Sequence, residues 1–262
     1  MSSVPMGGFN FTAHPGATKE RVEIYTPMGL TAELVAERYN ISRETQDEFA
    51  YHSHMKAVTA WKEGKFDDEI VKVPYRDANG DTKYLERDES MRPETTVESL
   101  SKLRPVFRVG GSVTAGNASP TNDGASVVMV MGLDKAKELG LKPMAYVRDF
   151  QVAGTAPEVM GIGPAVAIPK LWDHSGVGKD QIGLYEVNEA FAAQAHYCCF
   201  DALDLNPEIV NVNGGGIALG HPLGCTGAKL TTTLLNEMQR RKTKYGVVSM
   251  CIGGGMGAAG LF

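Results

Sequence analysis

A histidine within a glycine-rich turn gives the strongest chemical signal in this 262-residue sequence. In the segment NVNGGGIALGHPLGCTGAK at 211–229, a short apolar run gives way to glycines ahead of His221. Glycines leave backbone N–H groups accessible, so an imidazole held among them could help to stabilise an anion or a developing charge. The alternative is an ordinary turn whose histidine only hydrogen-bonds a carbonyl. The glycines favour the functional interpretation, because exposed backbone has a conformational cost.

A cysteine at the end of an apolar run is the second signal. The sequence CIGGGMG at 251–257 places Cys251 just before three glycines. A thiol in this position can act as a nucleophile or transfer a proton, and the N–H groups that follow can face an oxyanion. The alternative is a small buried hydrophobic residue, the usual role of a free cysteine. From the residues alone, we hypothesise a thiol enzyme with His221 and Cys251 as partners and an unidentified substrate.

Two further segments are weaker candidates. In VNEAFAAQ at 187–194, Asn188 and Glu189 follow an apolar run and are expected to begin a helix, where they would also suit an ordinary N-cap and first turn. The polar loop GNASPTNDGA at 116–125 precedes another apolar run, and most such loops are only connections. Neither segment indicates a chemistry by itself.

The spacing of the four cysteines argues against a disulfide framework and against a metal site. All of them lie in the last quarter of the chain, and Cys198 and Cys199 are adjacent, which is poor geometry for disulfides. His196 lies too close to this pair on one helix for tetrahedral metal ligation, so we expect these three residues to serve packing. We therefore expect no metal and a reducing compartment.

The composition, 43% hydrophobic with a net charge of -5, indicates a globular chain. This charge gives no general attraction to nucleic acid or to anionic membranes. No apolar run approaches the ~18 residues of a membrane span, and the N-terminus lacks a signal-peptide pattern. We expect a soluble intracellular protein with no nucleic-acid partner and no membrane span.

The elements that must position these residues change in character near residue 120. Before it, residues 1–25 are expected to be irregular, and apolar spacing predicts helices over 30–39 and 42–61 with a strand over 69–75. After it, apolar runs predict strands over 125–131, 145–152, 183–187, 209–212, 246–251 and 258–262, alternating with helices over 135–140, 190–203 and 225–241. This alternation predicts a layered α/β fold, with domains at 1–120 and 121–262.

Taken together, the motifs resemble those of thiolases. VNEAFAAQ, NVNGGGIALGHPLGCTGAK and CIGGGMGAAG occur in thiolase order and spacing, as do YTPMGLTAELVA at 25–36 and GNASPTNDGA, so the resemblance covers essentially the whole chain. It implies a thiolase-like layered α/β fold. Residues 1–120 would form a loop domain and linker covering coenzyme A, and residues 121–262 a C-terminal α/β half with a mixed sheet. Ketoacyl synthases are less similar, since they use a second histidine in place of Cys251.

The resemblance implies acyl transfer, in which a 3-ketoacyl-CoA is cleaved with CoA to acetyl-CoA and a shortened acyl-CoA, as in fatty-acid β-oxidation, or is formed by the reverse condensation. His221 would activate a nucleophilic cysteine and help to bind a thioester oxygen. Cys251 would transfer the proton at the α-carbon of acetyl-CoA. Asn188 would hold a water in the first oxyanion hole, and the N–H of Gly253 would belong to the second.

Binding positions and assembly are implied in the same way. Met28, Ser119 and Phe191 match positions that line the pantetheine or acyl pocket, with CoA and acyl-CoA as substrates and no cofactor. The Pro27-Met28 pair favours long-chain thiolases over the alternative, a short-chain acetoacetyl-CoA thiolase. The family implies a homodimer or homotetramer for the full-length enzyme, in the cytoplasm of a bacterium or in a mitochondrion or peroxisome of a eukaryote.

The chain departs from the family pattern at its start and in its cysteines. The run from Met1 to Pro5 resembles the middle of a family stretch, so we expect the N-terminal half-fold and its nucleophilic cysteine to be absent, since neither Cys198, Cys199 nor Cys225 occupies that motif. Such a fragment should not turn over and should expose apolar surface. The alternatives are a catalytically silent CoA-ester-binding or interaction subunit, and a thiol hydrolase with Cys251 as its nucleophile.

Overall fold

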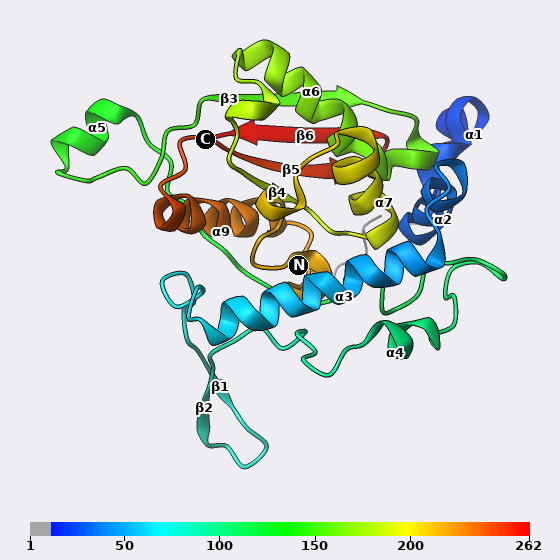
Figure 1. Cartoon of the computed structure of the whole chain (residues 1–262), viewed down its shortest axis with the longest axis horizontal. Coiled ribbons are helices and arrows are strands. Elements are labelled where there is room, and N and C mark those ends of the chain that lie inside the picture. The colour runs from blue at the N-terminus through cyan, green and yellow to red at the C-terminus, as the bar shows by residue number, and fades with distance from the viewer. Residues whose placement is uncertain (1–11) are drawn as a thin grey trace.

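The computed structural model describes residues 12–262, in which a four-stranded mixed sheet lies between helices and a long irregular excursion extends below it in the view of Figure 1. The predicted match of Met1 to Pro5 with a family stretch lies outside the described residues. The α/β class and the mixed sheet are as predicted.

The sheet consists of β3 (Asp149–Gly154), β4 (Leu184–Val187), β5 (Gly246–Ile252) and β6 (Met256–Leu261), in the order β3-β6-β5-β4. Strands β5 and β6 form an antiparallel hairpin, and β3 pairs antiparallel with β6. Strand β4 runs parallel to β5, with Val187 opposite Ser249. Because these two strands are parallel, the residues that follow them come to one edge of the sheet.

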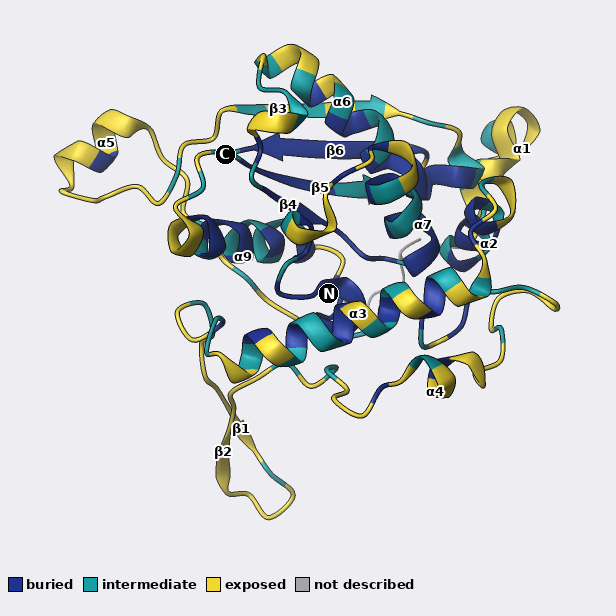
Figure 2. Cartoon of the chain, in the orientation of Figure 1, coloured by how far each residue is buried: buried dark blue, intermediate teal, exposed yellow. Residues whose placement is uncertain are grey.

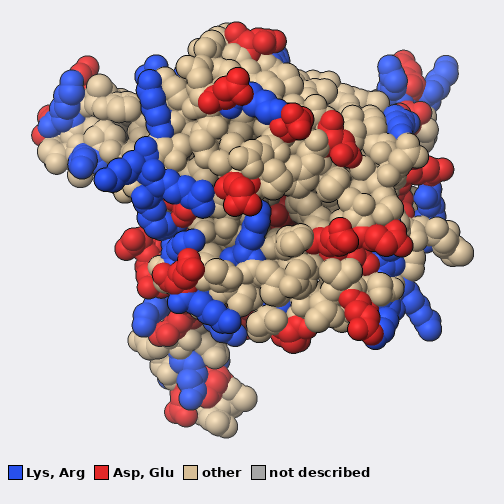
Figure 3. All heavy atoms as spheres, viewed as in Figure 1, with Lys and Arg blue, Asp and Glu red and all other residues tan. Residues whose placement is uncertain are grey.

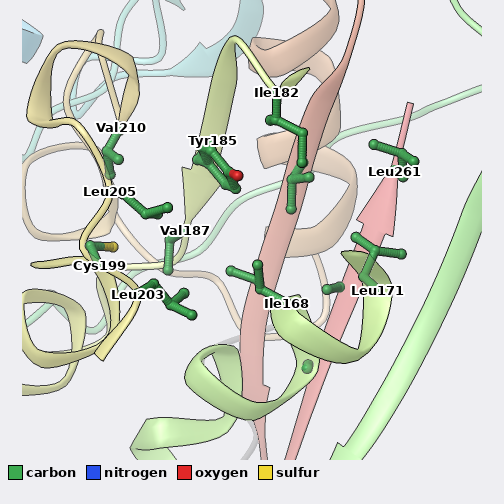
Figure 4. Close-up of a cluster of buried hydrophobic side chains, with 13 residues drawn as sticks. Ile168, Leu171, Ile182, Tyr185, Val187, Cys199, Leu203, Leu205, Val210 and Leu261 are labelled. Atoms are coloured by element: carbon green, nitrogen blue, oxygen red, sulfur yellow. The ribbon is translucent and has the colours of Figure 1, made fainter. Parts of the chain in front are cut away.

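Helices α6 (Gly163–Ser175) and α9 (Thr226–Arg241) cover opposite faces of the sheet. Successive strand residues alternate between the faces. Tyr185 and Val187 join the cluster that includes α6, drawn in Figure 4, whereas Leu184 joins the cluster under α9. Full burial of such side chains contributes roughly 1.5–3 kcal/mol each relative to exposure. Packing in these two clusters holds β4 and β5 in place from both faces of the sheet, and both strands end at the candidate site.

The remaining elements surround this sheet. They are α1 (Pro15–Arg21), α2 (Met28–Arg38), α3 (Arg43–Lys62), the hairpin β1 (Val73–Arg76) and β2 (Thr82–Leu85), α4 (Val97–Ser101), α5 (Leu133–Glu138), α7 (Ala192–His196), α8 (Gly216–Leu219) and the short helical turns Val22–Tyr25, Pro157–Ile162, Lys179–Gln181, Tyr197–Ala202 and Pro207–Ile209. Figure 2 shows that α9 and the sheet are largely buried, whereas α5 and the β1-β2 hairpin are exposed.

Helix α3 crosses beneath α7 and α8 and contacts both. Ser42 caps it, accepting a hydrogen bond from the N–H of Thr45. The buried side of α3 carries polar groups, among them Gln46, Asp47 and Ser53. These groups attach α3 to distant loops through hydrogen bonds, so the helix acts as a polar support rather than as a purely apolar one.

Two predicted strands are not formed. Residues 125–131 pair with no other strand among residues 12–262, and Val127, Met129 and Val130 are 90%, 77% and 74% exposed. A strand forms only where a neighbouring strand pairs its N–H and C=O groups, and the described part of the chain offers none here. Residues 209–212 form only a single parallel bridge, between Val210 and Tyr185.

Other boundaries differ by a few residues. The N-terminal stretch is not wholly irregular, since the imidazole of His14 caps α1 by accepting from the N–H groups of Gly16 and Ala17. The helix predicted to begin at residue 190 begins at Ala192 and continues as a π-helical turn. The strands predicted over 69–75 and 145–152 form later, as β1 and β3.

The surface carries charges of both signs. On the face drawn in Figure 3, Lys and Arg side chains gather around α5 and the end of α9, and acidic side chains lie among them and over α3. Between residues 12 and 262, no helix combines the length and the hydropathy that crossing a bilayer would require.

Candidate active site

Asn188 and His221 meet at the sheet edge where β4 and β5 end. The N–H of Asn188 donates to the carbonyl of Ser249 at 2.9 Å. The pairing of β4 with β5 therefore extends one residue past the end of β4. The amide Nδ2 of Asn188 lies 3.3 Å from Nε2 of His221. Cys251 lies two residues beyond Ser249 on β5. The structure therefore brings three of the four predicted catalytic residues to the same edge of the sheet.

The turn that carries His221 is fixed from two sides. Helix α8 ends at Gly220, whose φ of 91° lies in the region that favours glycine. A Cβ at this position would lie 2.6 Å from the amide of Asn122, which accepts a hydrogen bond from the N–H of His221 at 3.0 Å. On the other side, Nζ of Lys229 donates to the carbonyl of Gly220 at 3.0 Å.

The imidazole of His221 is neutral at pH 7, and both of its ring nitrogens have a side-chain partner. Its Nδ1 lies 2.6 Å from Oγ1 of Thr226, which donates its own proton to the carbonyl of Pro222. With the imidazole proton on Nδ1, Nδ1 donates to Thr226 and Nε2 accepts from Nδ2 of Asn188. Burial, reinforced by the charge of Lys229, lowers the pKa of His221 to about 4. At neutral pH, Nε2 therefore carries a lone pair that can take a proton.

Asn188 presents an unused hydrogen-bond acceptor at this edge. Its side chain is buried, and its Oδ1 has no hydrogen-bond partner among the described residues. An unsatisfied buried acceptor costs about 1–3 kcal/mol, so such atoms in native proteins usually face a water or a ligand. The arrangement fits a small polar group beside Nε2 of His221.

The sequence predicted Glu189 in the first turn of a helix. In the structure it lies instead beneath the glycine-rich loop. Its buried carboxylate accepts hydrogen bonds from Oγ of Ser53 at 2.5 Å, Nδ2 of Asn211 at 2.9 Å and the N–H of Ile217 at 3.3 Å. A Cβ on Gly215 would lie 2.2 Å from the carboxyl carbon, so only glycine fits there. Burial raises the pKa of Glu189, while these donors oppose the shift.

Cys251 has a protonated thiol. It is opposite Gly257 in the β5-β6 hairpin and is partly exposed at the surface. Burial raises its pKa to about 11, so the thiolate is scarce at neutral pH. This environment suits a proton donor and acceptor better than a nucleophile. Gly253, whose N–H was predicted to face an oxyanion, lies exposed in the turn that joins the two strands.

The other three cysteines are not poised to react. Cys198 and Cys199 are fully buried, and the thiol of Cys198 contacts the carbonyl of Gly161 at 3.6 Å, as expected for packing. Burial raises the pKa of both thiols and of Cys225, which lies at the start of α9. Within residues 12–262, no group of three His, Cys, Asp or Glu residues could hold a metal ion.

The loop at 116–125 is more than a connection, because it touches both site turns. The N–H of Ser119 donates to the carbonyl of Ala190 at 3.0 Å, and Asn122 holds His221 as described above. Phe191 packs on Ala118 of this loop and against the ring of Phe107, 6.0 Å away between ring centroids.

Met28, the third predicted binding residue, begins α2, which packs on α7. Ser119 and Phe191 are therefore close to Asn188 in the fold, and Met28 lies on a neighbouring helix. Contact of any of the three with coenzyme A stays a prediction.

Sequence reasoning missed four supporting residues. Thr226 and Lys229 lie in the same motif as His221, five and eight residues later, so a search at helical spacing after the histidine could have found them. Ser53 and Asn122 lie 162 and 99 residues from the backbone groups that they contact, at Gly215 and His221. No local pattern in the sequence indicates such pairs.

Comparison with known proteins agrees with this geometry. Family models described as "Thiolase, N-terminal domain" and "Thiolase, C-terminal domain" match residues 11–134 and 141–262. The whole chain is 52% identical to a protein named 3-ketoacyl-CoA thiolase from Bacillus subtilis and covers 69% of it.

Two solved structures are also similar. The Bacillus anthracis acetyl-CoA acetyltransferase shares 47% identity with a TM-score of 0.86, covering 89% of this chain and 59% of that one. The dimeric peroxisomal thiolase of Saccharomyces cerevisiae shares 42% identity with a TM-score of 0.83, covering 98% of this chain and 64% of that one. The present chain thus spans less than two thirds of either solved relative.

Proposed function

We propose, since this chain belongs to the thiolase family, that its site binds the thioester of a 3-ketoacyl-CoA and carries out the proton transfers of acyl transfer to CoA. One observation supports this most: Nε2 of a neutral His221 lies 3.3 Å from the amide nitrogen of Asn188, whose amide oxygen is unpaired. A base and an unsatisfied polar group at one sheet edge suit a reaction in which a carbonyl oxygen gains charge.

In the cleavage direction, a thiolate attacks the 3-keto carbonyl, and the C2–C3 bond breaks with its electron pair passing to C2. The protonated thiol of Cys251 would supply the proton that C2 requires, giving acetyl-CoA. Nε2 of His221 would take the proton of CoA as its thiol attacks the acyl group left behind. The sulfur that carried the acyl group would leave as a thiolate, and the proton on His221 would return to Cys251. A water held by Asn188 would donate to the thioester oxygen.

The four cysteines of this chain do not provide the attacking thiolate. All four of its cysteines have a raised pKa, and Cys198 and Cys199 are also fully buried. None is therefore suited to accept the acyl group, and we assign that role to a thiol outside these four. The raised pKa of Cys251 also argues against the hydrolase alternative, which needs a reactive thiolate there.

Substrate length and assembly belong to the same proposal. Met28, Ser119 and Phe191 would line the path of the pantetheine and acyl chain, with CoA esters as substrates. Relatives named for 3-ketoacyl-CoA and for acetyl-CoA both match, so a long-chain substrate is supported mainly by the Pro27-Met28 pair. The yeast peroxisomal relative is described as dimeric, and we propose the same assembly.

The test combines binding with proton exchange, because neither needs the acyl-accepting thiol. Calorimetry should detect binding of acetyl-CoA and acetoacetyl-CoA, and NMR in D2O should show exchange at C2 of acetyl-CoA above the buffer rate. Cys251→Ala should abolish the exchange and leave binding in place. Binding without exchange would support the silent CoA-ester-binding subunit, and no binding at millimolar ester would refute both. Thiolysis assays on the native protein, with its intact mass, complete the test.

A further inference from the structure

Thr226 lies between His221 and the backbone of the same turn. It is 1% exposed, and its hydroxyl oxygen is 2.6 Å from Nδ1 of His221 and 3.1 Å from the carbonyl of Pro222. The second contact joins the first residue of α9 to the turn that precedes the helix. The first is shorter and joins two side chains five residues apart.

One proton arrangement makes hydrogen bonds of all three contacts. In it, Thr226 gives its single hydroxyl proton to the carbonyl of Pro222, which can only accept. The hydroxyl oxygen must then accept from Nδ1 of His221. At the far end of the ring, the amide Nδ2 of Asn188 can only donate, which requires a bare Nε2.

We infer that Thr226 is a positioning residue that fixes the tautomer of His221, keeping the proton on Nδ1 and the lone pair on Nε2. This rests on the proposed function in one respect: a bare Nε2 matters only if His221 is a base. The hydroxyl would also remain a partner for Nδ1–H after Nε2 takes a proton, so the imidazolium needs no reorientation of the ring.

Loss of the hydroxyl offers the imidazole proton a different partner. Without Thr226 as acceptor, a proton on Nδ1 would be buried and unpaired, which is unfavourable. Rotation of the Asn188 amide would instead present its unpaired Oδ1 to a proton on Nε2. Thr226→Val should therefore convert His221 to the Nε2–H tautomer, which cannot act as a base at that nitrogen.

The experiment is ¹⁵N NMR of imidazole-labelled full-length chain at pH 7, where His221 is neutral. The chain has six histidines, so the His221 signals are identified by their loss in His221→Gln. The native protein should show an N–H type shift at Nδ1 and a bare-nitrogen shift at Nε2. These assignments should exchange in Thr226→Val and return in Thr226→Ser.

Thr231→Val is the matched control, because Thr231 also donates to the carbonyl four residues earlier but does not contact the imidazole. It should leave the His221 shifts unchanged. If Thr226→Val does not fold by circular dichroism, Thr226→Cys, a weaker acceptor of similar size, should show a mixture of tautomers. An Nε2–H signal in the native protein, unchanged shifts in a folded Thr226→Val, or an equal effect of Thr231→Val would overturn the inference. Failure of native protein to bind acetyl-CoA would refute the proposed function and leave the tautomer result intact.

Discussion

The hydroxyl of Ser53 on α3 donates a 2.5 Å hydrogen bond to the buried carboxylate of Glu189, 136 residues further along the chain. The same carboxylate accepts from Asn211 and from the N–H of Ile217, at the start of the short helix that leads to His221. One side chain thus holds a supporting helix, a strand end and the glycine-rich loop.

Removing one donor tests this role. Ser53→Ala leaves the carboxylate short of a hydrogen bond and frees the N–H of Gly215, which donates to Ser53. We expect the free energy of unfolding to fall by about 1–3 kcal/mol, measured by urea denaturation. Ser101→Ala is the matched control, because that exposed hydroxyl donates only to the carbonyl of Glu98. Equal effects of the two variants would show that Glu189 does not need Ser53.

His221 should make stability depend on pH. Its pKa is about 4 in the folded protein and about 6.5 when unfolded, so the unfolded chain binds more protons between these values. Stability should be fully present above pH 6.5 and fall as the pH drops toward 4, by at most about 3 kcal/mol. Urea denaturation of native protein and His221→Gln at pH 7 and pH 5 measures the difference. Identical pH dependence in both proteins would contradict the shifted pKa.

Lys229 should contribute to the low pKa of His221. Burial lowers the pKa of Lys229 itself, while neighbouring Asp88, Glu186 and Glu189 oppose that shift. Replacing the ammonium in Lys229→Met removes a cation near the imidazole, so the pKa of His221 should rise toward its ordinary value. Lys229→Arg should keep it low. Titration of the His221 NMR signal measures both, and an unchanged pKa in a folded Lys229→Met would show that burial alone is responsible.

Cys251 should react slowly with alkylating reagents. With a pKa of about 11, only about one thiol in a thousand is ionised at pH 8, compared with a sizeable fraction for a free cysteine near 8.5. Iodoacetamide labelling followed by peptide mass spectrometry should give a rate far below that of a cysteine-containing model peptide, and the rate should rise tenfold per pH unit up to pH 10. Rapid labelling at pH 7 that acyl-CoA prevents would instead support the hydrolase.

The unpaired segment at 125–131 should bind hydrophobic dyes. Val127, Met129 and Val130 are largely exposed beside a groove of about 540 Å³ along α9. Val130→Lys should reduce ANS fluorescence and aggregation while changing the free energy of unfolding by less than about 0.5 kcal/mol. Leu230→Ala, in the buried cluster under α9, should cost about 2–5 kcal/mol and serves as the contrast. A large loss of stability in Val130→Lys would show that this segment is packed.

Sequence patterns predicted the elements whose signal is local. The amphipathic spacing of α3 and α9 and the apolar runs of β4 and β5 placed those elements within one or two residues. The run at 125–131 failed because an apolar sequence becomes a strand only where another strand pairs with it. Periodicity reports which side of a segment is apolar, and it does not report whether a neighbour is present.

The glycines and motifs of the sequence predicted the main site residues. They did not predict the residues that hold those site residues in place. His221, Asn188 and Cys251 do reach one sheet edge, but the role of Glu189 was mistaken for that of a helix start. A buried carboxylate and a first-turn carboxylate look alike in sequence, because both follow a strand and precede apolar residues. Only the donors on α3 and on the glycine-rich loop distinguish them, and these donors come from elsewhere in the chain.

The distances along the chain between Ser53 and Glu189 and between Asn122 and His221 also bear on when the site appears during folding. Contacts separated by 136 and 99 residues require large loops to close, and such contacts form slowly compared with helices and hairpins. Helix α9 and the β5-β6 hairpin can arise locally, but the histidine gains its orientation only when α3 and the loop at 116–125 have both docked. Assembly of the site is therefore expected among the last events of folding, so that partly folded chains would contain every site residue and no functional arrangement of them.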